Sequence, residues 1–194
     1  MPSSMLPPGQ HEIEEIMRWN IDHPGILPQN PKFDPKEWKL VIDGTVKTPI
    51  TIGWKDLLDL PFRTIDADFH CVEGWSVKNC SWTGVLFNEV TKRVQPKKDV
   101  EFVLLSCADG YTTSLSLKDI NQESVLLAYK LNGKLLPESL GAPLRLITLD
   151  KYAYKSPMWL LRITFLKTQE LGYWEKRGYS GNANIWENDR FARK

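Results

Sequence analysis

The sequence has little net charge and no long apolar run. Its 25 Lys and Arg residues nearly balance its 24 Asp and Glu residues, which leaves a net charge of +1. Without a global positive charge, the composition does not favour nucleic acid or an anionic membrane surface as a partner. No apolar stretch approaches the roughly 20 residues that a membrane-spanning helix needs. We therefore expect no nucleic-acid partner and no membrane span.

Cysteine is scarce, with only Cys71, Cys80 and Cys107 in 194 residues. An odd number of cysteines does not favour a disulfide framework, and no Cys-x-x-Cys pair has the spacing of a zinc site. A haem-attachment motif and the cysteine set of an iron–sulfur cluster are absent as well. The first residues also lack the basic start and apolar stretch of a secretory signal. The expected location is therefore cytoplasmic.

Common catalytic signatures are missing too. The sequence contains no GxGxxG or GxxxxGKS phosphate loop and no GxSxG nucleophile motif. The histidines His11, His23 and His70 all lie in the first seventy residues. Nothing in the sequence therefore supports a simple nucleotide-binding loop or a serine hydrolase.

What is present is a pattern of many short strands with short helices between them. This pattern predicts an α+β fold with strand-dominated mixed sheets. Residues 1–35 are rich in proline and are expected to form an N-terminal arm and lead-in, with one helix over Glu12–Asn20; residues 36–194 are expected to form one domain. Asp43-Gly44 and Asn132-Gly133 are hairpin signals, and Val85–Val94 has helical spacing.

Cys71 follows an extended run, Arg63–His70, and precedes a turn at Glu73-Gly74. A thiol at the end of a strand beside a glycine has its sulfur available to a soft metal. The alternative is a small buried apolar residue, which is the usual fate of a free cysteine. His70 and Glu73 could each tune the thiol, but neighbours on a strand point to opposite faces, so only one should share its surroundings.

Arg145 lies inside an apolar strand, and Lys151 to Ser156 follow it with two lysines, two tyrosines and a serine. A buried arginine needs an anion. Cations and hydroxyls on a loop between strands suit a phosphate group. The alternative is a solvated turn in which Arg145 pairs internally, for example with Asp150.

The tail contains a basic, aromatic and glycine-rich segment from Trp174 to Asn182. One interpretation is a lid that brings Arg177 and Tyr179 to a site built elsewhere. The other is a polar tail whose aromatic side chains fill the end of the fold.

These clusters, in this order, resemble the molybdenum-cofactor domain of the sulfite oxidase family, which includes eukaryotic sulfite oxidases and the bacterial periplasmic methionine-sulfoxide reductase catalytic subunit. The shared pieces are a cysteine followed by a turn and a Trp-x-Gly, a Gly-x-Pro-x-Arg strand, and a C-terminal Trp-x-x-Arg-x-Tyr-x-Gly. Here they stand at Cys71 to Ser76, Trp82 to Gly84, Gly141 to Arg145, and Trp174 to Gly181.

The resemblance implies a molybdenum–molybdopterin cofactor. Cys71 would be the thiolate ligand of the metal. Arg145, Lys155 and Ser156 would hold the pterin and its phosphate.

Further roles follow from the same resemblance. Ser106 and Cys107 match a position that touches the cofactor in the reductase, where the residue is threonine. His23 is the candidate for a pterin contact made by the lead-in of some members. Tyr179 matches an active-site tyrosine, and Arg177 would bind an anionic substrate.

The sequence departs from the family in ways that bear on the substrate. Sulfite oxidases carry arginines just after the metal cysteine, whereas this chain has Glu73, Gly74 and Ser76, which resembles the reductase branch. Leu140 stands where the reductase has asparagine, and Met158 replaces a lysine.

The implied activity is oxygen-atom transfer to or from a small oxyanion or an S- or N-oxide, with electrons exchanged through a separate electron-transfer protein. The competing interpretation is a non-catalytic β-rich ligand-carrier or interaction domain that keeps the fold without metal.

Overall fold

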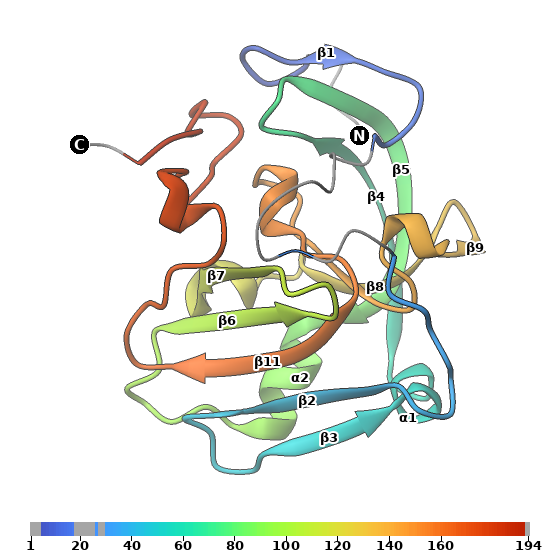
Figure 1. Cartoon of the computed structure of the whole chain (residues 1–194), viewed down its shortest axis with the longest axis vertical. Helices are drawn as coiled ribbons and strands as arrows, with labels where there is room; N and C mark the ends of the chain where they lie inside the picture. Colours follow the sequence, from blue (N-terminus) through green and yellow to red (C-terminus); the bar gives the residue numbers. More distant parts are fainter. Residues whose placement is uncertain (1–4, 18–25, 27–29, 193–194) are drawn as a thin grey trace.

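The computed structural model describes residues 5–17, 26 and 30–192 and contains two sheets (Figure 1). The first sheet has the order β1-β5-β8-β10, with β4 paired to β5 and β9 paired to β8. The second sheet has the order β3-β2-β11-β6-β7. This strand-dominated α+β architecture confirms the predicted fold class.

The first sheet is formed by β1 (His11–Glu12), β4 (Phe62–His70), β5 (Trp75–Leu86), β8 (Leu126–Leu131), β9 (Lys134–Leu135) and β10 (Arg145–Ile147). The second is formed by β2 (Lys39–Gly44), β3 (Ile50–Gly53), β6 (Phe102–Cys107), β7 (Thr112–Ser116) and β11 (Leu160–Leu166). The helices are α1 (Trp54–Leu58), α2 (Phe87–Val94) and α3 (Leu117–Ile120), with 3-10 turns η1 (Glu138–Leu140), η2 (Ala153–Lys155) and η3 (Glu175–Arg177).

The main core lies between the two sheets and is closed by α2, which packs its apolar face inward. Phe87, Val90 and Val94 of α2 are all fully buried there, together with Leu40 of β2 and Phe165 of β11. Burying a side chain of this size contributes about 1.5–3 kcal/mol. A second cluster on the other face of the first sheet includes Phe69, Trp75 and Trp82.

Gly84 explains the glycine of the Trp-x-Gly motif. A Cβ at this position would lie 2.2 Å from the backbone oxygen of Leu127, because β5 and β8 approach closely at a register shift between Thr83 and Gly84. Only glycine allows the two backbones to come this near. The motif therefore serves the packing of β5 against β8.

The predicted helix over Glu12–Asn20 is wrong as far as the described residues extend. Instead, β1 pairs in parallel with β5, and the amide of Ile13 donates to the carbonyl of Ser76 at 2.8 Å. Ile13 and Ile16 pack against the second core cluster. Their helical spacing reflects apolar contacts made by an extended chain, so the tertiary pairing overrides the local pattern.

Two other boundaries differ from the prediction. Val85 and Leu86 belong to β5, where they pair with Leu127 and Leu126 of β8, so α2 begins at Phe87. Asp43 and Gly44 are the end of β2 and not a hairpin turn, and the chain turns over residues 45–49. The predicted hairpin at Asn132-Gly133 is confirmed, since it joins β8 to β9.

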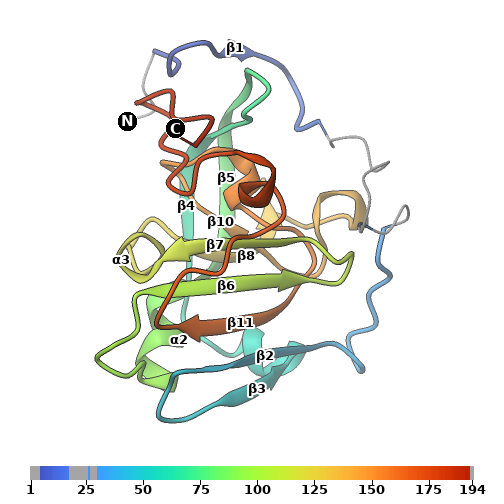
Figure 2. The ribbon, with the colours of Figure 1, turned by 60° about the vertical axis from the view of Figure 1, so that its left-hand side comes forward.

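The segment after β11 crosses the molecule and returns to the end where β4 joins β5. Figure 2 shows this last segment beside the β4–β5 end, with β1 at the same end. The N-terminal arm from Met5 to Gln10 also packs here, with Pro7 buried. Two ends of the chain therefore meet next to Cys71. Among the described residues, no helix has the length and apolarity to cross a membrane.

Candidate active site

A cavity of about 470 Å³ opens beside the turn that connects β4 to β5. This volume is in the range of small-molecule and cofactor sites. Its walls come from the arm, the β4–β5 turn, the turn after β6, β10, the η2 loop and the C-terminal segment: Ile16, Met17, Phe69, Cys71, Val72, Glu73, Trp75, Asp109, Tyr111, Leu140, Arg145, Ala153, Tyr154, Ser156, Pro157, Met158, Trp174 and Tyr179.

Cys71 lies in the turn and lines this cavity. Its amide donates to the carbonyl of Trp75 at 2.9 Å, and its carbonyl accepts from Gly74 at 3.1 Å. Gly74 closes the turn with φ +103, a conformation that favours glycine. Burial raises the pKa of the Cys71 thiol to about 12, so a positive charge or a metal is needed to hold it as a thiolate.

Glu73, and not His70, shares the surroundings of the thiol. Cys71 Sγ lies 3.9 Å from Glu73 Oε2, and that oxygen also accepts from Trp75 Nε1 at 3.3 Å. His70 points the other way, with Nδ1 2.7 Å from Ser76 Oγ. Burial lowers the pKa of His70. The expectation that only one neighbour would face the thiol is confirmed.

Arg145 brings a buried cation to the same cavity. Its side chain is 3% exposed, and its guanidinium donates to the backbone carbonyls of Leu140 at 3.1 Å and Ser156 at 3.0 Å. Its Nε has no hydrogen-bond partner, and no carboxylate of the described chain pairs with it. Burial lowers its pKa to about 10. The alternative of an internal pair with Asp150 is therefore wrong, and the guanidinium retains the capacity to bind an anion.

Ser156 also lines the cavity, and its hydroxyl is held by Thr148. The Thr148 amide donates to Ser156 Oγ at 3.0 Å, and the two hydroxyl oxygens are 3.1 Å apart. Ser156 is thus fixed beside Arg145, whose guanidinium binds the Ser156 carbonyl. The structure brings these two predicted cofactor contacts together.

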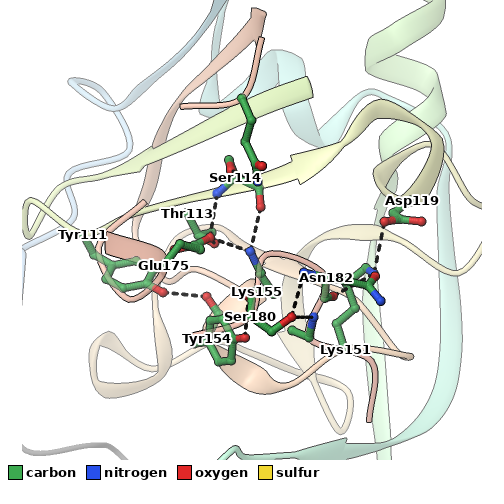
Figure 3. A network of polar contacts seen from close by, with 12 residues as sticks. Tyr111, Thr113, Ser114, Asp119, Lys151, Tyr154, Lys155, Glu175, Ser180 and Asn182 are labelled. Carbon is green, nitrogen blue, oxygen red and sulfur yellow. Dashed lines mark hydrogen bonds and ion pairs between the residues drawn. The ribbon is translucent and has the colours of Figure 1, made fainter. Parts of the chain in front are cut away.

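Lys155 is engaged elsewhere. Its ammonium is fully buried, lies 2.5 Å from Glu175 Oε1 and donates to the Ser114 carbonyl at 2.8 Å (Figure 3). Thr113 Oγ1 donates to the same carboxylate oxygen at 2.7 Å. Burial lowers the pKa of Lys155, while Glu175 opposes that shift. Lys155 therefore ties η2 to η3 behind the cavity wall and does not line the cavity, so its predicted cofactor contact stays a prediction.

The C-terminal segment supplies Tyr179 but not Arg177. Tyr179 lines the cavity and packs edge-on against Tyr154 and Trp174, with ring centroids 5.6 Å and 5.0 Å apart. The guanidinium of Arg177 instead stacks on the Tyr173 ring, 3.6 Å from its centroid, and donates to the Tyr173 carbonyl at 2.9 Å. The segment is therefore an aromatic wall whose arginine is turned away.

The remaining predicted residues lie behind the cavity or outside the described chain. Ser106 pairs with Thr112 in the second sheet, and Cys107 is buried with Tyr111 and Tyr173. Burial raises the pKa of Cys107 well above its usual range. Neither residue lines the cavity, and His23 lies outside the described residues.

The sequence interpretation missed several residues of the cavity. Asp109 and Tyr111 are not among the predicted site residues, yet both are buried and both line the cavity. Tyr111 donates its hydroxyl to the Tyr154 carbonyl at 2.6 Å. An aspartate two residues after the end of an apolar strand was the signal available in the sequence. Phe69 was missed because it looks like an ordinary strand residue; its ring lies 5.1 Å from the Arg145 guanidinium.

Comparison with known proteins identifies the family to which this site belongs. The family model described as "Oxidoreductase molybdopterin binding domain" matches residues 27–174. The chain belongs to this molybdopterin-binding oxidoreductase family. The match includes Cys71, Arg145 and Ser156, and it excludes residues 1–26 and the last twenty residues.

Relatives in this family cover the chain to different extents. The uncharacterized oxidoreductase YuiH of Bacillus subtilis (strain 168) is 33% identical over 98% of this chain and 93% of its own length. The protein-methionine-sulfoxide reductase catalytic subunit MsrP of Ralstonia nicotianae is 30% identical over 77% of this chain, and the MsrP of Campylobacter jejuni is 28% identical over 81%. The chain spans 51% and 60% of these two reductase subunits.

A solved structure shows the same fold. The sulfane dehydrogenase SoxCD from Paracoccus pantotrophus superposes with a TM-score of 0.69 at 18% identity, covering 77% of this chain and 42% of the SoxCD chain. The predicted sulfite oxidase-type fold is therefore confirmed.

Family membership makes the protein a molybdopterin-dependent oxidoreductase and does not favour the alternative of a carrier domain without cofactor. The residues present fit such a cofactor. A soft sulfur ligand and a buried guanidinium with an unsatisfied Nε face one cavity, as a metal–pterin carrying a phosphate requires.

Proposed function

We propose that the protein is a molybdenum–molybdopterin reductase that removes the oxygen atom from a neutral S-oxide. The observation that carries the proposal is the joint placement of the Cys71 thiol and the unpaired Arg145 guanidinium in one cavity. Cys71 would ligate molybdenum, and Arg145 with Ser156 would hold the anionic part of the pterin. When bound in its reduced state, the cofactor would supply the two electrons that the S-oxide gains and would accept its oxygen atom.

Charge on the substrate side supports a neutral oxide over sulfite. The carboxylate of Glu73 stands beside the proposed metal ligand, and Arg177 is turned onto Tyr173. Arg145 is the cation of the described cavity lining, and the cofactor would use it. An anion such as sulfite would approach Glu73 without a compensating cation. The similarity to two methionine-sulfoxide reductase subunits supports the same direction.

The rest of the wall fits an apolar sulfur compound. Trp75, Met158, Trp174 and Tyr179 line the same cavity as Cys71 and Glu73. Aromatic and thioether side chains offer favourable contacts to sulfur and keep water away from the reacting bond. Tyr179, whose ring faces the cavity, is the proposed donor that orients the oxide oxygen.

The reaction balances with an external reductant. A sulfoxide, two protons and two electrons give a sulfide and water. The described chain contains no group of metal-ligating residues that could hold a second centre, and its cysteines are free. Electrons would therefore come from a separate electron-transfer protein.

Three free thiols are also compatible with a reducing compartment, and we propose the cytoplasm as the location, which cell fractionation tests.

Expression in a molybdopterin-producing host tests the proposal. The purified protein is expected to contain molybdenum and pterin near one per chain and to oxidise a reduced dye with methionine sulfoxide. Cys71→Ser should lose molybdenum and turnover while its circular dichroism and melting midpoint stay near those of the cofactor-free wild type. Full activity of Cys71→Ser would disprove the ligand assignment.

Glu73→Gln tests the substrate assignment. Glu73→Gln should raise kcat/KM for sulfite oxidation, measured with an artificial acceptor, by about fivefold relative to kcat/KM for sulfoxide reduction. The reason is that the substitution removes a negative charge that repels sulfite near the site. Glu187→Gln, on the exposed C-terminal segment, is the matched control. Sulfite turnover above sulfoxide turnover in the wild type would overturn the proposed direction.

A further inference from the structure

The turn that carries Cys71 is held by side chains from both ends of the chain. Gln10 Nε2 donates to the carbonyl of Cys71 at 3.0 Å. Arg190 Nη1 donates to the carbonyl of the next residue, Val72. These partners lie 61 and 118 residues away from the turn in sequence. Two consecutive carbonyls at the proposed metal ligand thus receive hydrogen bonds from outside the family match at residues 27–174.

Gln10 forms a bridge and not a single contact. Its Oε1 accepts from Ser76 Oγ at 2.9 Å, so one carboxamide joins the two sides of the turn, Cys71 and Ser76. Because the Ser76 hydroxyl has a single proton and gives it to Gln10, the 2.7 Å contact with His70 requires His70 Nδ1 to be the donor. The bridge therefore also fixes the tautomer of the residue before the metal ligand.

Arg190 joins the Cys71 turn to the N-terminal arm. Its Nη2 donates to the Gly9 carbonyl at 3.1 Å, and its Nε donates to Asn188 Oδ1 at 2.7 Å. A Cβ on Gly74 would lie 3.1 Å from that same Gly9 oxygen, so the arm rests directly on the turn. The amide of His11 adds a bond to the Gly74 carbonyl at 2.8 Å.

We infer that Gln10 and Arg190 are positioning residues that clamp the Cys71 turn and set the direction of its sulfur. The turn has two internal backbone hydrogen bonds, Cys71 to Trp75 and Gly74 to Cys71, and its tip residue Glu73 is exposed. A ligand on such a turn needs outside support to keep one geometry. The clamp supplies it through carbonyls that the internal bonds leave with free lone pairs.

The inference rests on the proposed role of Cys71, but its test uses cofactor-free protein. The variants are Gln10→Leu, Arg190→Met and the double variant, treated with iodoacetamide, with modification of each cysteine followed by mass spectrometry. Cys71 should react at least fivefold faster in each single variant, and faster still in the double variant, because the freed turn exposes the thiol.

Gln10→Glu separates the two halves of the bridge. A carboxylate keeps the acceptor for Ser76 but has no donor for the Cys71 carbonyl, so this variant should reproduce the increase seen with Gln10→Leu. Arg190→Lys keeps one charged donor and should restore part of the wild-type rate.

Matched controls come from elsewhere in the chain. Gln122 donates to the Lys118 carbonyl at 2.6 Å, and Arg162 pairs with Asp43 at 2.6 Å, both on the surface. Gln122→Leu and Arg162→Met should leave the Cys71 rate unchanged. Cys80 and Cys107 are 2% and 8% exposed and serve as internal reporters of unfolding.

Three results would overturn the inference, and a fourth would contradict the proposed function. Cys71 rates within twofold of wild type in the double variant would overturn the inference, as would a parallel rise at Cys80 and Cys107, which would show general unfolding. In loaded protein, the electron paramagnetic resonance spectrum of the metal should shift in the same variants; an unchanged spectrum also overturns the inference. Absence of molybdenum from the wild type would instead contradict the proposed function and leave the thiol result readable.

Discussion

Arg145 shows at the scale of one residue how a buried charge indicates a ligand. Its guanidinium is almost fully buried, donates to two backbone carbonyls and retains an unpartnered Nε. Desolvating a cation without an opposite charge costs several kcal/mol. This desolvation cost can be offset by a bound anion, and Arg145 lines the cavity in which such an anion would bind.

Arg145→Met is therefore expected to separate stability from cofactor binding. The substitution loses two hydrogen bonds worth about 1 kcal/mol each and removes a desolvation cost of several kcal/mol. The cofactor-free variant should unfold at the same or a higher denaturant concentration than wild type, while its molybdenum content after expression falls at least tenfold. Arg162→Met, which breaks an exposed pair with Asp43, is the control and should keep its cofactor. Normal molybdenum content in Arg145→Met would contradict the assignment.

At the scale of elements, the cavity wall depends on one buried ion pair. Lys155 of η2 and Glu175 of η3 are 0% and 1% exposed at the side chain and lie 2.5 Å apart. The neighbours of the pair, Tyr154, Ser156 and Trp174, line the cavity. The pair thus fixes the C-terminal segment against the loop after β10 (Figure 3).

Lys155→Met should destabilise the protein by about 3–5 kcal/mol, because it leaves the Glu175 carboxylate buried without its partner. The double variant Lys155→Met/Glu175→Met should regain most of this loss, since no buried charge remains. Urea unfolding followed by tryptophan fluorescence measures both. Lys167→Met breaks the exposed pair with Asp99 and should leave the midpoint unchanged. Equal stability of Lys155→Met and Lys167→Met would refute the structural role of the pair.

Segments from both ends and from the middle of the described chain line the cavity. Its lining comes from the N-terminal arm, the β4–β5 turn, the turn after β6, β10 with the loop that follows it, and the tail. None of these segments forms the cavity alone, so a ligand that binds there stabilises the folded chain as a unit. A ligand at a thousand times its dissociation constant adds about 4 kcal/mol to the free energy of unfolding.

Protein loaded with cofactor should accordingly melt at least 5 °C above the cofactor-free protein, since about 1 kcal/mol shifts the midpoint by about 2–4 °C in a chain of this size. Differential scanning calorimetry of both forms measures the difference. Cys71→Ser, expressed in the same host, should melt near the cofactor-free wild type. Identical midpoints for loaded and cofactor-free wild type would show that the cofactor is not held by this cavity.

The sequence by itself determined the strand-rich fold, the place of Cys71 after a strand, and the family. These depend on local hydrophobic periodicity and on motifs of a few residues, which a single chain displays directly. The hairpin at Asn132-Gly133 and the different surroundings of His70 and Glu73 followed from the same local rules.

Only the tertiary structure decided which cations face the cavity and that side chains from both ends of the chain bind the Cys71 turn. The sequence offers both Arg145 and Arg177 as anion-binding residues, yet one lines the cavity and the other stacks on Tyr173. Lys155 forms an ion pair with Glu175, 20 residues away in sequence, and Gln10 donates to the carbonyl of Cys71, 61 residues away. Side-chain direction and charge pairing depend on packing between distant segments. For that reason no local pattern could reveal them. The same holds for Glu12, the first residue of a predicted helix, which pairs with β5 instead.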